Sequence, residues 1–299
     1  MRRDMTETNT LKLWSAVLAV VAAAMLALLA ALTTAPTASA ALPGGPGATF
    51  AVRCDFSHRN FDDPIVHPGK PGEAHQHDFF GNTSTKFDST YESMLASTTS
   101  CTRPDDKAGY WLPTVKWNGQ DTQAFRGVFY YRAGGKVHTQ VKPFAANLKV
   151  INATRITWRC GIADEGASTT TPPTRCTGGV LGVRIIFPDC VAKDSNGQQL
   201  LDSADHKSHM ARSVLRDGTR RCPNSHPIPV PALTINANFN IPTTRGEVTL
   251  SSGAASTMHA DFWNTWNQAV LEHLVQSCIN EVAPSEPRPE ECRAPTATA

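Results

Sequence analysis

The sequence predicts a mainly β fold: a sandwich or jelly-roll-like single domain, with a carboxy-terminal helix packed on it and disulfides that fasten its loops. Three observations support this class. Short runs rich in β-branched and aromatic residues alternate with Gly, Pro, Asn and Asp. One segment near the carboxy terminus has a helical apolar period. Eight cysteines are spread along the chain, and many short strands are typical of sandwiches and jelly rolls.

The amino terminus has the parts of a secretion signal. Basic residues precede an apolar run at 13–32, and Ala38-Ser39-Ala40 supplies the small residues that a signal peptidase accepts. An uncleaved membrane anchor is the competing interpretation, because about 20 apolar residues can span a bilayer. The A-S-A site and the Pro/Gly-rich segment after it favour cleavage, which leaves no stable membrane span. We expect a signal peptide at 1–40, a linker at 41–47, a single secreted domain at 48–282 and a flexible tail at 283–299.

Several runs are expected to form strands because turn residues bound them. Between Leu233 and Phe239, apolar and polar side chains alternate, which indicates a strand with one solvent-facing side. A short helix is expected to begin near Ser89, because Glu92 follows at the spacing of a capping box. The expected strands are 48–54, 110–117, 125–132, 155–160, 182–187, 232–239 and 247–250.

The longest helical pattern runs from Asp261 to about Asn280. Apolar residues recur every four positions from Trp266 to Cys278, so one broad face is apolar and is expected to pack on the sheet. Asp261 or Asn264 would cap the start of this helix.

All eight cysteines lie beyond the expected cleavage point, and an even number in an exported chain indicates a disulfide framework. The sequence has no C-x-x-C pair of the zinc-ribbon type. Roughly 100 pairings are open in principle, and the sequence does not select among them. Short loops suggest Cys160–Cys176, Cys190–Cys222 and Cys278–Cys292, which leaves Cys54 and Cys101.

Composition and motifs exclude several classes of protein. The formal charge is +2, and no block of Lys and Arg follows the amino terminus, so nucleic acid is not an expected partner. The sequence lacks a G-x-S-x-G nucleophile elbow, an H-E-x-x-H zinc motif and a phosphate-binding glycine loop. We expect a monomeric globular protein.

Histidine and aspartate are grouped in short motifs. In H-Q-H-D-F-F-G-N, His75 and His77 project to the same side of an extended chain, and such a pair can offer two imidazoles to one metal ion. In L-D-S-A-D-H-K-S-H-M, His206 and His209 would share a face if the segment were helical. Two further histidines lie beside element boundaries, His226 and His259.

We expect the two histidines of H-Q-H to meet other histidines at one polar cleft, because buried polar groups must satisfy one another. Converging imidazoles would bind a divalent metal ion, zinc most naturally; without metal, the cleft would be a hydrogen-bonded sugar pocket. Loop fastening is the expected role of His58, His67, His138 and His273. The candidate metal ligands are His75, His77, His206, His209, His226 and His259, and the candidate catalytic carboxylates are Asp78, Asp202, Asp205 and Asp261.

Aromatic residues in the expected strands could serve a sugar ligand. An exposed row of rings on a sheet is a usual sugar platform, but core packing is expected to account for most of them. The rings in question are Tyr110, Trp111, Trp117, Tyr130, Tyr131 and Trp158.

Several rare motifs in a fixed order resemble a secreted domain-of-unknown-function family found in actinobacteria and fungi. They are H-P-G-K-P-G-E-A-H-Q-H-D-F-F-G-N, F-P-D-C, L-D-S-A-D-H-K-S-H-M, C-P-N-S-H-P-I-P-V-P, L-S-S-G and H-A-D-F, and the likeness covers residues 50–280. The resemblance implies secretion and a cell-wall setting, since fungal members often carry WSC modules associated with wall carbohydrate. This chain has no such module, and the resemblance implies no particular chemistry.

Together these patterns predict a secreted protein that acts on or binds cell-envelope or environmental polysaccharide through a His/Asp-rich cleft. Metal-assisted or two-carboxylate hydrolysis is one form of this function. The alternative is a non-catalytic carbohydrate-binding or wall-associated structural protein.

Overall fold

The computed structural model describes residues 48–137, 140–162, 168–282 and 289–293. The expected signal peptide at 1–40, the linker at 41–47 and His138 lie outside the described residues, as does most of the expected tail. In the described ranges, no helix is both long enough and apolar enough to cross a membrane.

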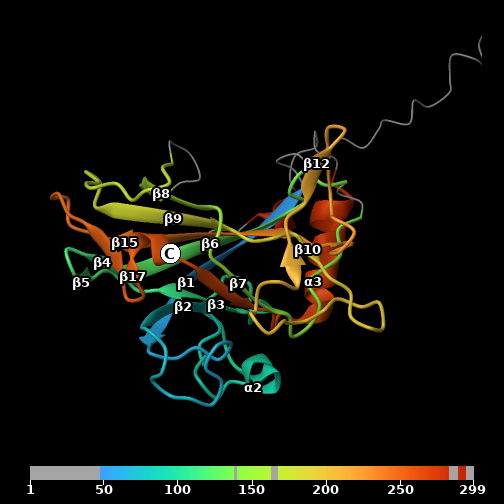
Figure 1. Ribbon diagram of the computed structural model, residues 1–299, viewed down its shortest axis with the longest axis horizontal. Helices are drawn as coiled ribbons and strands as arrows, with labels where there is room; N and C mark the ends of the chain where they lie inside the picture. Colours follow the sequence, from blue (N-terminus) through green and yellow to red (C-terminus); the bar gives the residue numbers. More distant parts are fainter. Residues whose placement is uncertain (1–47, 138–139, 163–167, 283–288, 294–299) are drawn as a thin grey trace, which may run out of the picture. The chain divides into compact units, whose positions relative to one another are not determined.

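The domain is built on a nine-stranded sheet in which every neighbouring pair is antiparallel. The strand order is β7-β18-β3-β2-β1-β6-β15-β9-β8. In Figure 1, β8 and β9 lie at the top of the sheet and β2 and β3 lie towards the bottom. The strands are β1 (Thr49–Asn60), β2 (His77–Gly81), β3 (Gly109–Pro113), β6 (Gln123–Arg132), β7 (Lys149–Asn152), β8 (Ile156–Cys160), β9 (Val180–Ile186), β15 (Ala232–Asn240) and β18 (Ala260–Trp263).

Three smaller sheets complete the β structure, and the predicted mainly β class is confirmed. One has the order β17-β16-β4-β5, one has the order β11-β10-β14, and the third is the hairpin β12-β13. Their strands are β4 (Val115–Trp117), β5 (Gln120–Asp121), β10 (Cys190–Val191), β11 (Met210–Ala211), β12 (Val214–Arg216), β13 (Thr219–Arg221), β14 (Ile228–Pro229), β16 (Val248–Leu250) and β17 (Gly253–Ala254).

The first expected helix forms as α2 (Tyr91–Ala96), but its capping pair differs from the predicted one. Thr90, rather than Ser89, is the N-cap: its hydroxyl accepts from the Ser93 backbone N–H, and the Ser93 hydroxyl accepts from the Thr90 backbone N–H. Ser therefore takes the place that Glu or Gln has in the usual capping box.

The carboxy-terminal helix α3 (Gln268–Val275) begins later than predicted. The prediction of a helix from Asp261 is wrong. Residues 260–263 form the buried strand β18, which pairs with β3 on one side and with β7 on the other. Pairing in the sheet overrides the helical spacing. The N-cap is Asn267, without a side-chain bond, and α3 continues as a π-helix, η3 (Gln276–Asn280).

The four disulfides join the pairs that loop length suggested, together with the remaining pair Cys54–Cys101. Cys278–Cys292 connects η3 to the short 3-10 helix η4 (Glu290–Cys292). Cys292 is buried, so the described part of the expected tail is fixed to the domain.

The main core holds most of the aromatic rings that were candidate sugar platforms. Tyr130 is the partly exposed member of this set. The guanidinium of Arg132 lies over its ring, 4.3 Å from the ring centroid. Core packing therefore explains this set, as expected for most of its members. The fully or almost fully buried rings are Tyr110, Trp111, Trp117, Tyr131 and Trp158.

A buried hydrogen-bond network crosses this core. The Tyr110 hydroxyl lies 3.0 and 3.1 Å from the two carboxylate oxygens of Asp106 and 2.6 Å from the Tyr131 hydroxyl. The Trp266 indole N–H donates to the Tyr131 hydroxyl at 3.0 Å. Asp106 is fully buried, and its burial raises its pKa to about 8.

Asp106 should make stability depend on pH. The folded protein keeps its proton up to about pH 8, whereas the unfolded chain loses it near its ordinary value of about 4, so the free energy of unfolding falls as pH rises between these values. Against Asp106→Asn, which cannot ionise, we expect the wild type to lose about 1.4 kcal/mol per pH unit in this window. Urea unfolding of both proteins measures this difference. Parallel pH profiles would contradict it.

Candidate metal centre

The sheet places a histidine and an aspartate on one face. Strands β2 and β18 lie on either side of β3, where His77 pairs with Pro113 and Asp261 pairs with Trp111. Pro113 and Trp111 are two residues apart on β3, so they project to the same side of the sheet. The side chains of His77 and Asp261 therefore share that side, although their positions are far apart in the sequence.

Two loops bring further imidazoles to this point. His75 precedes β2, and His259 immediately precedes β18. One ring nitrogen from each of His75, His77 and His259 lies within 4.8 Å of the others. Ring centroids are 4.2 Å apart for His75 and His77, 5.1 Å for His75 and His259, and 5.9 Å for His77 and His259.

Two carboxylates complete the cluster. Asp63, His77 and Asp261 also offer ligand atoms within 4.8 Å of one another, so His77 belongs to both groups. Asp261 is fully buried, and its Oδ2 lies 3.8 Å from His259 Nε2. Asp63 Oδ1 accepts the backbone N–H groups of Ile65 and Val66, which holds the loop after β1 in place. We name His75, His77, His259, Asp63 and Asp261 the His/Asp cluster.

Backbone carbonyls set the orientation of two of the rings. His77 Nδ1 lies 3.0 Å from the Asp62 carbonyl oxygen, and His259 Nδ1 lies 2.9 Å from that of Thr257. A carbonyl only accepts, so Nδ1 carries the proton in each ring and Nε2 keeps its lone pair. This is the usual support for a metal-binding imidazole.

The inward-facing polar atoms of the cluster lack hydrogen bonds. Among the described residues, Nε2 of His75, Nε2 of His77 and both carboxylate oxygens of Asp261 are buried without a partner. Each such group costs roughly 1–3 kcal/mol when it stays unsatisfied. Ordered water or a bound cation would satisfy several such atoms that meet at one point.

Burial also controls the ionisation of the cluster. It lowers the pKa of His75 to about 4, with a smaller contribution from His259, and it lowers the pKa of His77 well below the ordinary value. Burial raises the pKa of Asp261 well above its usual range. The imidazoles are therefore neutral near pH 7, which is the form that binds a metal ion.

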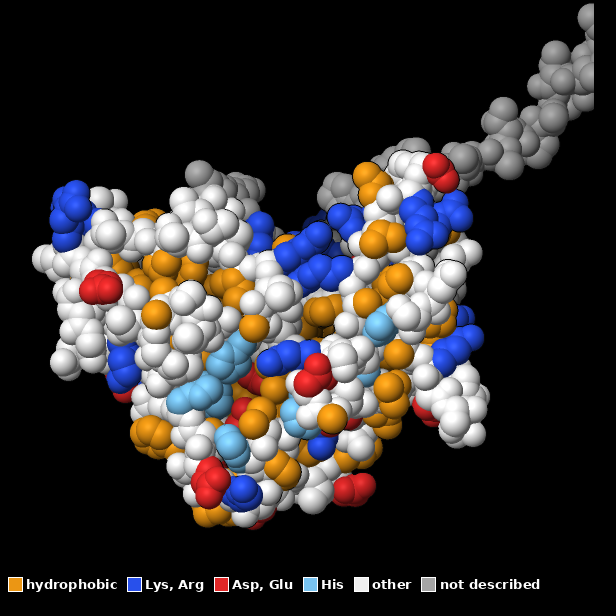
Figure 2. All heavy atoms as spheres, viewed as in Figure 1, with side chains coloured by type: hydrophobic (Ala, Val, Ile, Leu, Met, Phe, Trp, Pro, Cys, Tyr) orange, Lys and Arg blue, Asp and Glu red, His pale blue; other side chains and the backbone are white. Residues whose placement is uncertain are grey.

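The cluster opens to a pocket, so a small molecule can reach it. Figure 2 shows His side chains gathered on this face of the domain. Asp63, His77 and Asp261 are buried, whereas His75 and His259 are partly exposed. The polar residues lining the pocket are Asp63, His67, His75, Lys207, His259 and Asp261.

Three of the candidate metal ligands lie elsewhere and make hydrogen bonds that fasten loops. His206 Nδ1 is 2.9 Å from Asp202 Oδ1, and His209 Nδ1 is 2.9 Å from the Ser203 hydroxyl. His226 Nε2 donates to the Ser208 carbonyl at 2.9 Å. The segment from 201 to 210 forms turns, with His206 at a positive φ of 56°, so the helical spacing inferred from the sequence does not apply.

The other candidate catalytic carboxylates are also engaged in structure. Asp78 follows His77 directly in β2 and so points to the opposite face, where it binds Arg59 Nε at 2.5 Å and accepts from the Thr114 hydroxyl. Asp205 accepts the backbone N–H groups of residues 207 and 208. Asp202 pairs with His206 as described above.

Two residues of this site were not anticipated. Asp63 was not predicted as a site residue, because nothing in the sequence F-D-D-P indicates that it is buried. His67 was expected to fasten a loop, but it lines the pocket. His58 does fasten a loop, as expected: its ring binds the Ser57 hydroxyl and the Thr85 carbonyl.

Fold and site together define a disulfide-fastened, mainly β domain with a buried His/Asp cluster. The sequence profile described as "Domain of unknown function (DUF1996)" matches residues 63–266, more than half of the chain, and the chain belongs to this family. The matched span contains every member of the His/Asp cluster. Comparison with curated proteins and with solved structures gave no match.

Two buried aspartates should respond in opposite ways to the same substitution. In the presence of chelator, we expect Asp261→Asn to raise the free energy of unfolding by about 1–3 kcal/mol, because an amide N–H can donate to the imidazole Nε2 acceptors that face this position, whereas a carboxylate cannot. Asp78→Asn should lower it by about 2 kcal/mol, because it breaks an ion pair with Arg59. Denaturant unfolding of both variants tests the contrast, and destabilisation of similar size in both would contradict it.

Proposed function

We propose that this chain is a secreted protein that binds a divalent metal ion, zinc most naturally, and hydrolyses a cell-envelope or environmental polysaccharide. The three imidazoles of His75, His77 and His259 would hold the ion, and the Asp261 carboxylate beside them would balance its charge. One observation carries the proposal: the buried Nε2 atoms and carboxylate oxygens of this cluster face one another without hydrogen bonds. A cation satisfies all of them at once.

A hydrogen-bonded network without metal accounts for this geometry less well. Nδ1 of His77 and of His259 already holds the ring proton, so each Nε2 is an acceptor. Burial favours the protonated form of Asp261, which could donate only one hydrogen bond, and its oxygens make none with the described residues. A divalent ion would engage the Nε2 atoms together and favour the ionised form of the carboxyl group.

The donor set favours zinc. Zinc binds imidazole nitrogen and carboxylate oxygen in tetrahedral sites, and sites that perform catalysis keep one position for water or substrate. The pocket beside His75 and His259 provides access to such a position. A zinc ion there would supply an activated water molecule near pH 7.

The residues around the cluster would take part in binding and proton transfer. Asp63 has Oδ1 held by backbone N–H groups, while its carboxylate still reaches the cluster, so it is placed to accept a proton from water. Lys207 lines the same pocket and would bind the oxygen atoms of a substrate.

Export and the sugar substrate rest on other observations. The first 40 residues have the sequence of a secretion signal, and four disulfides suit an oxidising compartment. The resemblance to secreted proteins of a cell-wall setting supports polysaccharide as the substrate class.

Metal binding can be tested in protein purified without chelator. We expect about one equivalent of metal, and in competition with a chromophoric chelator we expect His77→Ala to weaken zinc binding at least about tenfold, because it removes the ligand shared by both groups. His226→Ala is the matched control, since its ring hydrogen-bonds to Ser225 and Ser208 and to no other residue that the structure describes. Equal affinity in the two variants would contradict the proposed site.

Hydrolysis is then measured as new reducing ends from cell-wall polysaccharides. We expect release that stops on chelation, returns on addition of zinc and is absent in His77→Ala. Glycan binding by the metal-loaded protein without release would contradict hydrolysis and favour the non-catalytic alternative.

A further inference from the structure

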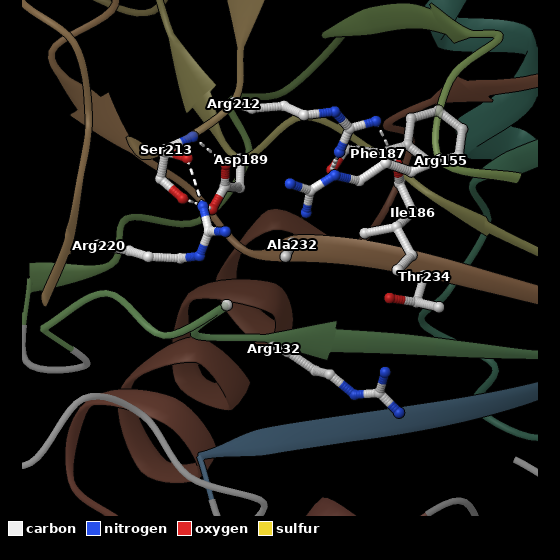
Figure 3. A pocket seen from close by; sticks show the side chains of 11 residues that line it. Arg132, Arg155, Ile186, Phe187, Asp189, Arg212, Ser213, Arg220, Ala232 and Thr234 are labelled. Atoms are coloured by element: carbon white, nitrogen blue, oxygen red, sulfur yellow. Dashed lines mark hydrogen bonds between the residues drawn. The ribbon is translucent and has the colours of Figure 1, made fainter. Parts of the chain in front are cut away.

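A second pocket, outside the His/Asp cluster, is lined by several arginines. Arg155 comes from the loop before β8, Arg212 from the segment between β11 and β12, and Arg220 from β13. Figure 3 shows the guanidinium groups of these three residues directed towards the same opening, whereas Arg132 points away from it. We name Arg155, Arg212 and Arg220 the arginine pocket.

The one carboxylate that lines this pocket is already neutralised. Asp189 is buried and pairs with the buried Lys136 at 2.5 Å, and it also accepts from the Ser213 backbone N–H at 2.7 Å and the Ser213 hydroxyl at 2.8 Å. Arg155, Arg212 and Arg220 form no ion pair with any carboxylate in the part of the chain that the structure describes. Three positive charges thus face the pocket without a counter-ion from those residues.

Backbone carbonyls hold two of the arginines in place. Arg212 donates to the carbonyls of Phe187 at 3.2 Å and Ile186 at 2.7 Å, and Arg220 donates to the Ser213 carbonyl at 2.5 Å (Figure 3). These bonds fix the guanidinium groups but leave their charge uncompensated. Fixed groups lose little conformational freedom when they bind a ligand.

The proximity of like charges affects the pKa of Arg212. Burial, and after it the neighbouring charge of Arg155, lowers the pKa of Arg212 to about 10. An anion in the pocket would relieve this repulsion. Arginine binds planar carboxylates and tetrahedral phosphates through paired N–H groups, which makes either oxyanion a fitting ligand.

The arginine pocket and the His/Asp cluster share one segment of chain. Ala153 lines the pocket of the cluster, Arg155 lines the arginine pocket, and Arg212 donates to the hydroxyl of Thr154 between them. Figure 2 shows Lys and Arg side chains in a hollow on the same face as the histidines. A polymer could therefore contact both sites at once.

We propose that the arginine pocket binds an oxyanion of an acidic polysaccharide, a carboxylate or a phosphate, and so selects an anionic glycan for the His/Asp cluster. This inference rests on the proposed function for its substrate class, but the anion site is defined by its own residues. Oxyanion recognition by Arg155, Arg212 and Arg220 does not require metal.

Binding is tested with the full secreted chain after chelation, so that hydrolysis does not interfere. The probes are an oligouronate, an oligo(glycerol phosphate) and a neutral oligosaccharide of equal length, titrated calorimetrically at low salt. We expect one or both anionic probes to bind and the neutral probe not to bind. Comparison of the oligouronate with the oligo(glycerol phosphate) shows whether the pocket prefers a carboxylate or a phosphate. Binding should weaken as the salt concentration rises.

Arg155→Ala is the decisive variant because this side chain is exposed and forms no hydrogen bond with the described residues, so its loss leaves the fold intact. We expect affinity for the anionic probe to fall about tenfold or more, the usual effect of losing a charge-assisted hydrogen bond. Arg216→Ala, an exposed arginine of β12 outside the pocket, is the control of equal charge and should stay within about twofold of wild type.

Equal losses in the two arginine variants, or equal binding of the neutral probe, would overturn the proposal. His77→Ala separates it from the metal proposal, because that variant should still bind the anionic probe. Arginine-dependent binding in a protein that takes up no metal would mean that only the metal proposal has failed. Metal-dependent release from neutral glycan, with no anion binding, would mean that only the arginine proposal has failed.

Discussion

The buried carboxylate of Asp261 is the constraint on which the candidate site depends. A fully buried carboxylate without a hydrogen bond costs considerable free energy, and the fold surrounds it with imidazoles rather than with donors. Strand pairing fixes this arrangement, because β2 and β18 both flank β3 and so project His77 and Asp261 from one face. Such costly groups persist in a stable domain when they serve a ligand.

The opposite faces of the sheet pack against different apolar groups. On one face, Phe80, Tyr110 and Phe262 pack in the main core. On the other, a small apolar group that includes Phe79 and Trp111 supports the His/Asp cluster; these two rings stack at 5.6 Å, and His77 lies edge-on to Phe79. The main core supplies stability, and the smaller group holds the side chains of the His/Asp cluster in position.

The sequence predicted local features well and distant contacts poorly. The strand positions, the four disulfide pairs and the pairing of His75 with His77 follow from patterns within a few tens of residues. The solvent-facing side expected for 232–239 was wrong, because both sides of β15 are buried. The helix expected at Asp261 failed because sheet pairing on both sides of 260–263 decided its conformation. Asp63 was missed, and His206 was grouped with the wrong partners, because burial and turn geometry arise only when distant segments meet.

Anomalous diffraction from crystals grown without chelator tests the central claim most directly. Data collected on both sides of the zinc absorption edge identify the element and its position together. The account predicts a single peak bounded by the Nε2 atoms of His77 and His259, by His75 and by the Asp261 carboxylate. An empty cluster in crystals soaked with zinc, with the Asp261 carboxylate hydrogen-bonded to protein or water instead, would contradict it.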